Sequence, residues 1–359
     1  MAINSSVSER YTLFFGLKIR NPFHFFEALP KNDCIFPAMT RWIVLLYLVM
    51  GAGFGVAQTP EADPFDQLMG RLSNTHRWGV NDSLGTLNYI TPARRLAAAQ
   101  NIREGTTLSL AFPLDTLRTS YNRNPLEHRF FKDDEWQGSL FNADYYGLAY
   151  HGSMHTHVDG LTHITHQGKI YNNYSTQTIS PKGAERLGIE NLKNGIVGRA
   201  VLIDLPLLKG VEYLPPGSPI YTEDLQAFEQ KYGVALQQGD ILLLYTGRWI
   251  AWAKNPHWEP FAGSAGLHYS AMAYLHKQQI AVLGSDGIND VFPSQHPMQS
   301  APVHKLALVA MGMPLLDNLN LDALADEARK HQQWTFFFMA SPLIVNGGTG
   351  SPLNPLILF

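Results

Sequence analysis

Four histidines and one aspartate gather between positions 151 and 163, in a chain of 359 residues of which 16% are charged. The run reads HGSMHTHVDGLTH. Side chains alternate between two faces of an extended segment, so His151, Ser153, His155, His157 and Asp159 would share one face. Imidazole nitrogens and carboxylate oxygens suit zinc, manganese or iron better than calcium. The run therefore predicts a metal site, although any one of these histidines alone would more often be structural or at the surface.

A metal ion held by His157 and Asp159 needs ligands from elsewhere in the chain. The best-placed candidates are His304, at the start of a predicted helix over residues 302–311, and Asp317, just beyond the next apolar residues. A helix followed by a returning strand would bring both to one end of a layer. Taken singly, His304 could instead be a surface histidine, and Asp317 could cap the following turn.

The composition indicates a globular protein without a nucleic-acid partner. Hydrophobic residues make up 45% of the chain, and the formal net charge is -3 with no long basic run. The single cysteine, Cys34, precedes the region expected to fold. Disulfides, thiolate zinc ligands and a cysteine nucleophile are therefore excluded from that region, which leaves histidine, carboxylates and water for chemistry.

The N-terminal region has the features of a secretory signal. Residues 39–41 contain a positive charge, residues 42–49 are apolar, and small residues precede a cleavage position after Ala57. The apolar stretch is shorter than the about 20 residues of a membrane span. We expect residues 1–57 to be an extension plus signal peptide (39–57), residues 58–77 a leader, and residues 78–359 the domain. The expected protein is secreted or periplasmic, without stable membrane insertion after cleavage; an uncleaved anchor is the alternative.

Strand and helix patterns alternate through the rest of the chain. The sequence pattern predicts strands at 106–111, 200–205, 241–246 and 280–284. Residues 315–316 are also apolar, and residues 334–338 are an aromatic run. Helical patterns cover residues 222–232, capped by Thr222 and ended by Gly233, a stretch from Ser270, 302–311, ended by Gly312, and 321–331. Because no linker or internal repeat interrupts them, they predict a single mixed α/β domain. Two irregular segments, 117–137 and 249–266, are expected to be loops that shape a pocket.

The residues from His155 to His163 resemble the motif His-x-Gly-Thr-His-x-Asp-x-Pro-x-His of the cyclase family of metal-dependent hydrolases, which includes kynurenine formamidase and isatin hydrolase. The similarity extends from about Trp78 to the end of the chain, as expected for a longer-chain member. It includes segments 239–243, 246–248, 283–286, 312–319 and 347–352, together with His304.

The resemblance implies a swivelling β/β/α domain with a central mixed sheet, often assembled as a homodimer with the site near the subunit contact. It implies that His157 and Asp159 bind a divalent metal, Zn or Mn, and that His163 carries the proton. His304 would bind a second metal, with Asp317 in place of the glutamate usual in the family.

The chain departs from the family motif at several positions. The first histidine of the motif falls on Ser153 and its glycine on His155, so His155 becomes the substitute third ligand, with His151 as the other possibility. Leu161 replaces the proline. Because Asp317 is one methylene shorter than glutamate, a single metal with His304 and Asp317 around its ligands remains the alternative.

The expected function is hydrolysis of an amide, cyclic amide or lactone of a small molecule by metal-activated water, with His163 as the proton shuttle. A lyase or cyclase reaction at the same site is one alternative, and a non-catalytic secreted metal-binding protein is another. Residues 347–350 lack the lysine of a phosphate-binding loop. Ser153 and Ser351 lack the Gly-x-Ser-x-Gly motif, which argues against a serine hydrolase.

Overall fold

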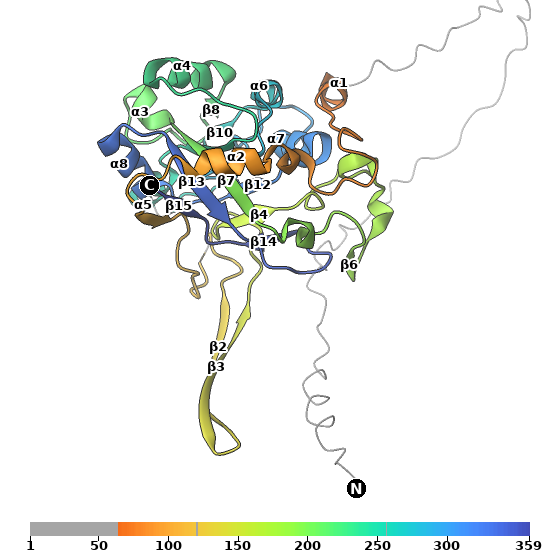
Figure 1. Ribbon diagram of the computed structural model, residues 1–359, viewed down its shortest axis with the longest axis vertical. Coiled ribbons are helices and arrows are strands. Elements are labelled where there is room, and N and C mark those ends of the chain that lie inside the picture. Colours follow the sequence, from red (N-terminus) through yellow and green to blue (C-terminus); the bar gives the residue numbers. More distant parts are fainter. Residues whose placement is uncertain (1–63, 120, 256) are drawn as a thin grey trace, which may run out of the picture. The chain divides into compact units, whose positions relative to one another are not determined.

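A computed structural model describes residues 64–119, 121–255 and 257–359 (Figure 1). Within these residues the main sheet has nine strands in the order β1-β15-β13-β7-β9-β11-β12-β4-β14. The strands of this sheet are β1 (Thr107–Ser109), β4 (His157–Asp159), β7 (Ile196–Asp204), β9 (Ile241–Tyr245), β11 (Val282–Ser285), β12 (Leu315–Asp317), β13 (Thr335–Ala340), β14 (Gly350–Pro352) and β15 (Leu356–Leu358). The signal peptide expected at residues 39–57 lies outside the described residues.

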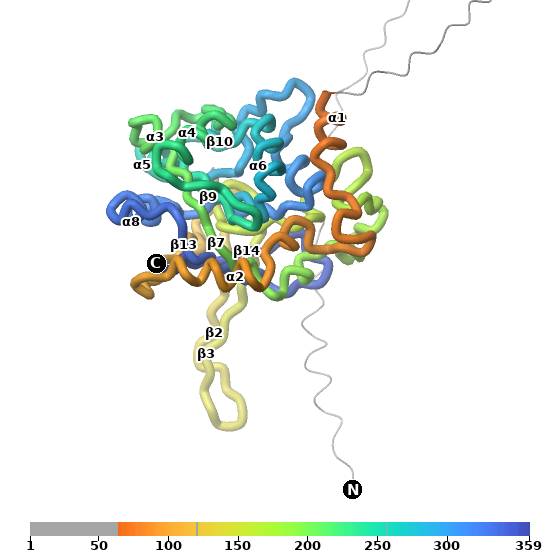
Figure 2. The backbone as a smooth tube through the Cα atoms, turned by 45° about the horizontal axis from the view of Figure 1, so that its top comes forward, coloured from red at the N-terminus to blue at the C-terminus, as the bar shows by residue number. Residues whose placement is uncertain are grey.

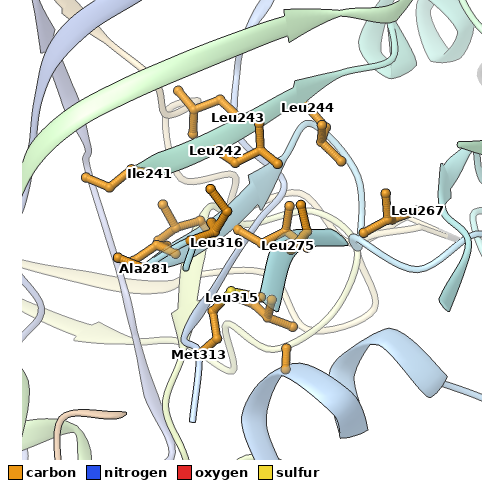
Figure 3. Close-up of a cluster of buried hydrophobic side chains, with 14 of the residues drawn as sticks. Ile241, Leu242, Leu243, Leu244, Leu267, Leu275, Ala281, Met313, Leu315 and Leu316 are labelled. Carbon is orange, nitrogen blue, oxygen red and sulfur yellow. The ribbon is translucent and has the colours of Figure 1, made fainter. Parts of the chain in front are cut away.

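The centre of the sheet is parallel and its two sides are antiparallel. Strands β7, β9, β11 and β12 pair in parallel, whereas β13 pairs antiparallel with β7 and β4 pairs antiparallel with β12. Every residue of β9 is buried, as expected for a parallel strand covered on both faces. Figure 3 shows Ile241, Leu242 and Leu243 of this strand packed near Leu315 and Leu316. The expected single α/β domain with a central mixed sheet is confirmed.

Helices and short paired strands complete the fold. The helices are α1 (Pro64–Arg71), α2 (Pro92–Ala99), α3 (Leu205–Lys209), α4 (Thr222–Tyr232), α5 (Arg248–Lys254), α6 (Met272–Gln278), α7 (Pro302–His304), the π-helix η7 (Lys305–Met311) and α8 (Asp322–His331). The small strands are β5 (Ile179–Ser180), β6 (Gly183–Ala184), β8 (Pro219–Ile220) and β10 (Gly266–Leu267). No helix in the described ranges is long and apolar enough to span a bilayer.

Most predicted helices lie where the pattern places them, with differences at their ends. Helix α4 ends at Gly233, whose left-handed φ of 65° suits glycine. Thr222 is its first residue rather than its cap, and Asp224 instead accepts the backbone N–H of Tyr221 at 2.9 Å. The predicted helix over 302–311 is α7 continued by the π-helix η7, and it ends at Gly312 with φ 67°.

The folded part begins earlier than Trp78. Helix α1 lies in the segment expected to be a leader, yet Phe65 is 1% exposed and Leu68 and Met69 are buried beside it. Asp66 of the same helix lies 2.8 Å from Nε2 of His166. The short apolar face of this eight-residue helix packs on the body of the domain, so residues from Pro64 onward belong to the fold.

The segment expected to be an irregular loop at 117–137 instead contains the first strand of a long hairpin. Strands β2 (Glu127–Trp136) and β3 (Ser139–Gly147) pair antiparallel and stand out from the rest of the domain (Figures 1 and 2). We call residues 127–147 the arm. All of its described strand residues are exposed except Gly147, which is half-buried. Charged residues obscure the alternation of the strands in the sequence, and the pairing shifts between Phe131 and Asp134.

Candidate metal centre

Strand pairing brings together two parts of the site that are far apart in the sequence. His157 and Asp159 are alternate residues of β4, so they lie on one face. In the antiparallel pairing with β12, His157 stands opposite Asp317. Both strands are fully buried. The sheet therefore places an imidazole and two carboxylates at one position inside the protein.

Helix α7 adds His304 to this position, and Asp290 orients it. The Asp290 carboxylate accepts the backbone N–H of Val303 at 2.8 Å and that of His304 at 3.1 Å, and lies 2.6 Å from Nδ1 of His304. Nε2 of His304 then lies 3.3 Å from Asp159 Oδ2 and 3.7 Å from Asp317 Oδ2. A carboxylate on the far ring nitrogen is the usual way of orienting a metal-binding histidine. Nothing near Asp290 in the sequence indicates this role.

His151 approaches the other oxygen of Asp159. Its Nδ1 lies 2.9 Å from Asp159 Oδ1, and Nε2 of His157 lies 3.3 Å from the same oxygen. Nδ1 of His157 lies 2.7 Å from the backbone oxygen of His155. Because that oxygen only accepts, Nδ1 is the nitrogen that carries the proton of the neutral ring. Two groups of possible ligands result, His151–His157–Asp159 and Asp159–His304–Asp317, each with its donor atoms within 4.8 Å of one another. Asp159 belongs to both.

The donor set fits a divalent cation. Both oxygens of Asp159 and Nδ1 of His151 are buried and have no partner in hydrogen-bonding geometry, which is costly for a carboxylate that is 1% exposed. The separations between these donor atoms resemble the about 3.4 Å expected between tetrahedral ligands that each lie about 2.1 Å from one ion. A cation between them would satisfy the buried atoms.

The electrostatics of the site point the same way. Burial opposes the protonation of His157, but Asp159, Asp317 and the backbone oxygen of His155 together outweigh it and raise the pKa of His157 to about 9. Burial also opposes protonation of His304, yet Asp159, Asp290 and Asp317 hold its pKa well above the ordinary value. These carboxylates thus attract positive charge into the interior. A bound cation would take the place of the protons.

His163 lies beside these groups rather than within them. Its ring stacks on His151 at 3.9 Å between centroids, and its Nε2 lies 3.8 Å from Asp159 Oδ2. Burial is the main reason why its pKa falls to about 4. Its imidazole is therefore neutral at pH 7 and able to accept a proton. The turn that carries His163 forms although Leu161 stands where the motif has proline. Leu161 is buried, and the backbone N–H of His163 donates to the backbone oxygen of Gly160 at 3.0 Å.

The structure does not bring His155 to either ligand group. Only residues 157–159 are a strand, whereas residues 151–156 follow bends, so the expected extended run from His151 is wrong. Gly152, with φ 144°, turns the chain so that His151 reaches Asp159. His155 instead lines a neighbouring cavity, and burial lowers its pKa. Among the two candidates for the third ligand, the geometry favours His151.

A cavity of about 330 Å³ opens onto the site. His157, Asp159, His163, His304 and Asp317 line one part of it. Its other walls are largely apolar and include Ile164, Phe261, Ile288 and Phe292. The segment 249–266 therefore contributes to the pocket through Phe261, as the sequence suggested, although its first residues, up to Lys254, belong to helix α5. A small organic molecule with a flat or apolar part would fit these walls.

Fold and site together define an α/β protein whose buried histidine and aspartate groups suit a divalent metal. The model of a family described as "Putative cyclase" matches residues 102–289. A solved structure described as a novel cyclase is 30% identical, covers 81% of this chain and 99% of its own, and has a TM-score of 0.73. This chain belongs to the cyclase family.

A more distant solved structure shares the fold. Isatin hydrolase A from Labrenzia aggregata, bound to benzyl benzoate, is 20% identical, with a TM-score of 0.51 over 74% of this chain and 98% of its own. No curated protein matches the chain.

Proposed function

We propose that this protein is a metal-dependent hydrolase that cleaves an amide, a cyclic amide or a lactone of a small molecule. The observation that carries the proposal is the shared Asp159, whose two unpartnered oxygens face His151 and His157 on one side and His304 on the other. Membership of the cyclase family and the adjacent apolar cavity support it.

The residues of the chain have separate tasks in this proposal. A bound Zn²⁺ or Mn²⁺ would supply a water that ionises near neutral pH and would polarise the carbonyl of the substrate. His163, neutral at pH 7, accepts a proton at Nε2 and passes it to the leaving nitrogen or oxygen. Asp290 keeps His304 oriented through Nδ1. The apolar wall at Phe261 and Phe292 holds the substrate and excludes bulk water.

Metal removal and isotopic labelling test the reaction class. The purified protein is analysed for bound metal, stripped with a chelator and reloaded, and each form is assayed against formamides, cyclic imides and lactones. Hydrolysis requires turnover that is lost and regained with the metal, and one solvent oxygen in the product when the water is ¹⁸O-labelled. Product without solvent oxygen would point to lyase or cyclase chemistry. Metal binding without turnover of any of these compounds would favour the non-catalytic alternative.

The stoichiometry of the same preparation distinguishes one metal from two. The two groups share Asp159, so the carboxylate could bridge a pair of ions, one between His151 and His157 and one between His304 and Asp317. Two ions per chain are expected for this arrangement. One ion per chain would leave one of the two groups as hydrogen-bonding support for the other.

We propose that the arm makes this protein a homodimer. An isolated two-stranded hairpin is marginally stable in water. Seven large apolar residues of the arm are nevertheless 45–66% exposed: Phe130, Phe131, Trp136, Leu140, Phe141, Tyr145 and Tyr146. At about 100 Å² each, half of a typical large side chain, they offer about 700 Å². Adjacent residues of a strand point to opposite faces, so a second copy must cover both faces of the arm to bury this area. A standard interface buries about 800 Å² per partner, and a partner that encloses the arm would come close to it.

Light scattering after gel filtration tests the dimer. Trp136→Ser with Leu140→Ser should convert the dimer to a monomer, whereas Leu96→Ser, on an exposed position of α2, should not. A wild-type monomer at micromolar concentration, or a double variant that remains dimeric, would overturn the role of the arm.

We also propose that the mature protein is exported to the periplasm or the medium. The support is the signal pattern of residues 39–57 alone. N-terminal sequencing of the mature protein should begin at Gln58. A mature N-terminus upstream of Met39 would contradict cleavage and favour an anchored or retained form.

A further inference from the structure

Arg248, at the start of α5, is a buried cation whose hydrogen bonds end on neutral groups. It is 5% exposed and lies over the ring of Trp249, 4.5 Å from the centroid. Its Nη1 donates to the backbone oxygen of Asp286 at 3.2 Å and to Oδ1 of Asn318, and its Nη2 donates to the backbone oxygen of Ser153. A buried guanidinium is costly unless its donors are used. Here Nη1 and Nη2 join three separate segments of the chain, whereas Nε is buried without a hydrogen-bond partner.

The carboxylate that balances this charge is occupied elsewhere. Asp286 accepts the backbone N–H groups of Thr246 and Arg248 and the Thr246 hydroxyl, at 2.8 to 3.1 Å. Asp286 thus fixes the turn before α5. The guanidinium is left to reach Asn318 and Ser153 rather than to form a two-pronged ion pair.

Asn318 extends the connection toward the metal centre. Its Nδ2 donates to the backbone oxygen of Gly152 at 2.7 Å and to that of His155 at 3.2 Å. Its backbone oxygen accepts the Thr156 hydroxyl at 2.7 Å. Asn318 directly follows Asp317, and its φ of 56° is a left-handed conformation that asparagine tolerates. One residue therefore ties the end of β12 to the irregular segment 152–156.

That segment lies between two candidate ligands. His151 precedes Gly152, and His157 follows Thr156. The His155 oxygen that accepts from Asn318 also lies 2.7 Å from Nδ1 of His157. Residues 151–156 have no strand ladder of their own. His151 is held from outside by Thr349, whose Oγ1 lies 3.0 Å from its Nε2, and the backbone N–H of Leu353 donates to the backbone oxygen of Thr156 at 3.1 Å. The backbone oxygens of Gly152, Ser153 and His155 are held by the bonds from Arg248 and Asn318.

We propose that Arg248 and Asn318 are positioning residues for the metal site. They fix segment 152–156 so that His151 and His157 meet the same cation at Asp159. This inference rests on the proposed metal site and adds two residues that touch neither the cation nor the substrate. A loss of this connection should weaken cation binding far more than it weakens the fold.

Cation affinity of the metal-free protein is the readout. Co²⁺ is titrated while its visible absorption is recorded, so that both the dissociation constant and the geometry of the ion are measured. Asn318→Asp keeps the size but places oxygens against the oxygens of Gly152 and His155. Arg248→Lys keeps the charge but loses the planar fork. Each should weaken Co²⁺ binding by about 10- to 100-fold, as for other residues that orient metal ligands, and alter the absorption.

A matched variant separates positioning from general stability. Arg329→Lys disturbs another ion pair, with the buried Asp204 at 2.7 Å. It should lower the melting temperature of the metal-free protein but leave the Co²⁺ dissociation constant and spectrum unchanged. Thr156→Val, which removes a single hydroxyl bond without changing shape, should fold and weaken binding by a few fold.

Two outcomes would overturn the inference in distinguishable ways. Variants of Arg248, Asn318 and Thr156 that bind Co²⁺ with wild-type affinity and spectrum would show that the connection only stabilises the fold. Failure of the wild-type protein to bind Co²⁺, Zn²⁺ or Mn²⁺ would remove the metal site itself, and with it both proposals.

Discussion

Replacement of His163 by alanine should abolish most of the activity while leaving the metal in place. The imidazole lies next to both ligand groups, but its Nε2 is 3.8 Å from Asp159 Oδ2. It is 29% exposed on the side of the cavity, so it can meet a substrate there. Its removal deletes a proton carrier rather than one of the grouped metal donors.

The size of the effect follows from the task assigned to His163. A positioned acid or base contributes about 100- to 10,000-fold to a rate. At about 1.36 kcal/mol for each factor of ten, this corresponds to about 2.7–5.4 kcal/mol of transition-state stabilisation. Because only neutral His163 accepts a proton, wild-type activity should persist above its pKa of about 4 and fall as the pH drops through that value. The residual activity of His163→Ala should not show this fall at low pH.

The assay compares kcat/KM and bound metal per chain for wild type, His163→Ala and His331→Ala. His331 is an exposed histidine paired with Glu327 on α8, so its loss should change neither quantity. Full activity in His163→Ala would refute the shuttle. Loss of metal together with activity would refute the distinction between His163 and the ligands.

The remaining predictions concern the third ligand and the start of the fold. His151→Ala should weaken Co²⁺ binding at least tenfold, because Nδ1 of His151 lies 2.9 Å from Asp159 Oδ1. His155→Ala should change Co²⁺ binding little. Equal effects of the two substitutions in the same titration would contradict the ligand grouping. Phe65→Ala should lower the unfolding free energy by about 3–5 kcal/mol in denaturant melts, since the ring is 1% exposed. An exposed Leu96→Ala is the control, and a Phe65 variant as stable as that control would place α1 outside the fold.

The interior of the fold was predictable because its signals are local. An unbroken apolar run such as residues 241–245 can only be a buried element, and the flanking turns limit it to a strand. Gly233 and Gly312 likewise end their helices through a left-handed φ that glycine adopts freely. The arm and α1 were missed for the opposite reason. The charges of the arm mask its alternation, and α1 is an eight-residue helix stabilised by contacts with distant residues.

The site was predictable as a set of residues but not as an arrangement. The motif similarity and the dense histidine run pointed to His157, Asp159, His304 and Asp317, which the structure brings together. Nothing in the sequence indicated the role of Asp290, and Asn318 was marked only as part of the family-like segment 312–319. Their roles depend on carbonyl and imidazole groups far away in the sequence.

The sequence alone determined the chemistry available to this protein. Without cysteine in the described residues, the donors are imidazoles and carboxylates, and the apolar runs require a buried sheet to carry them. Only the tertiary structure decided which donors meet. A two-residue period places His151 and His155 alike on the face of His157 and Asp159. Because Gly152 turns the chain and Asn318 holds the carbonyls of Gly152 and His155, His151 faces Asp159 and His155 does not. Side-chain direction in an irregular segment is set by its distant hydrogen-bond partners, which spacing along the chain does not encode.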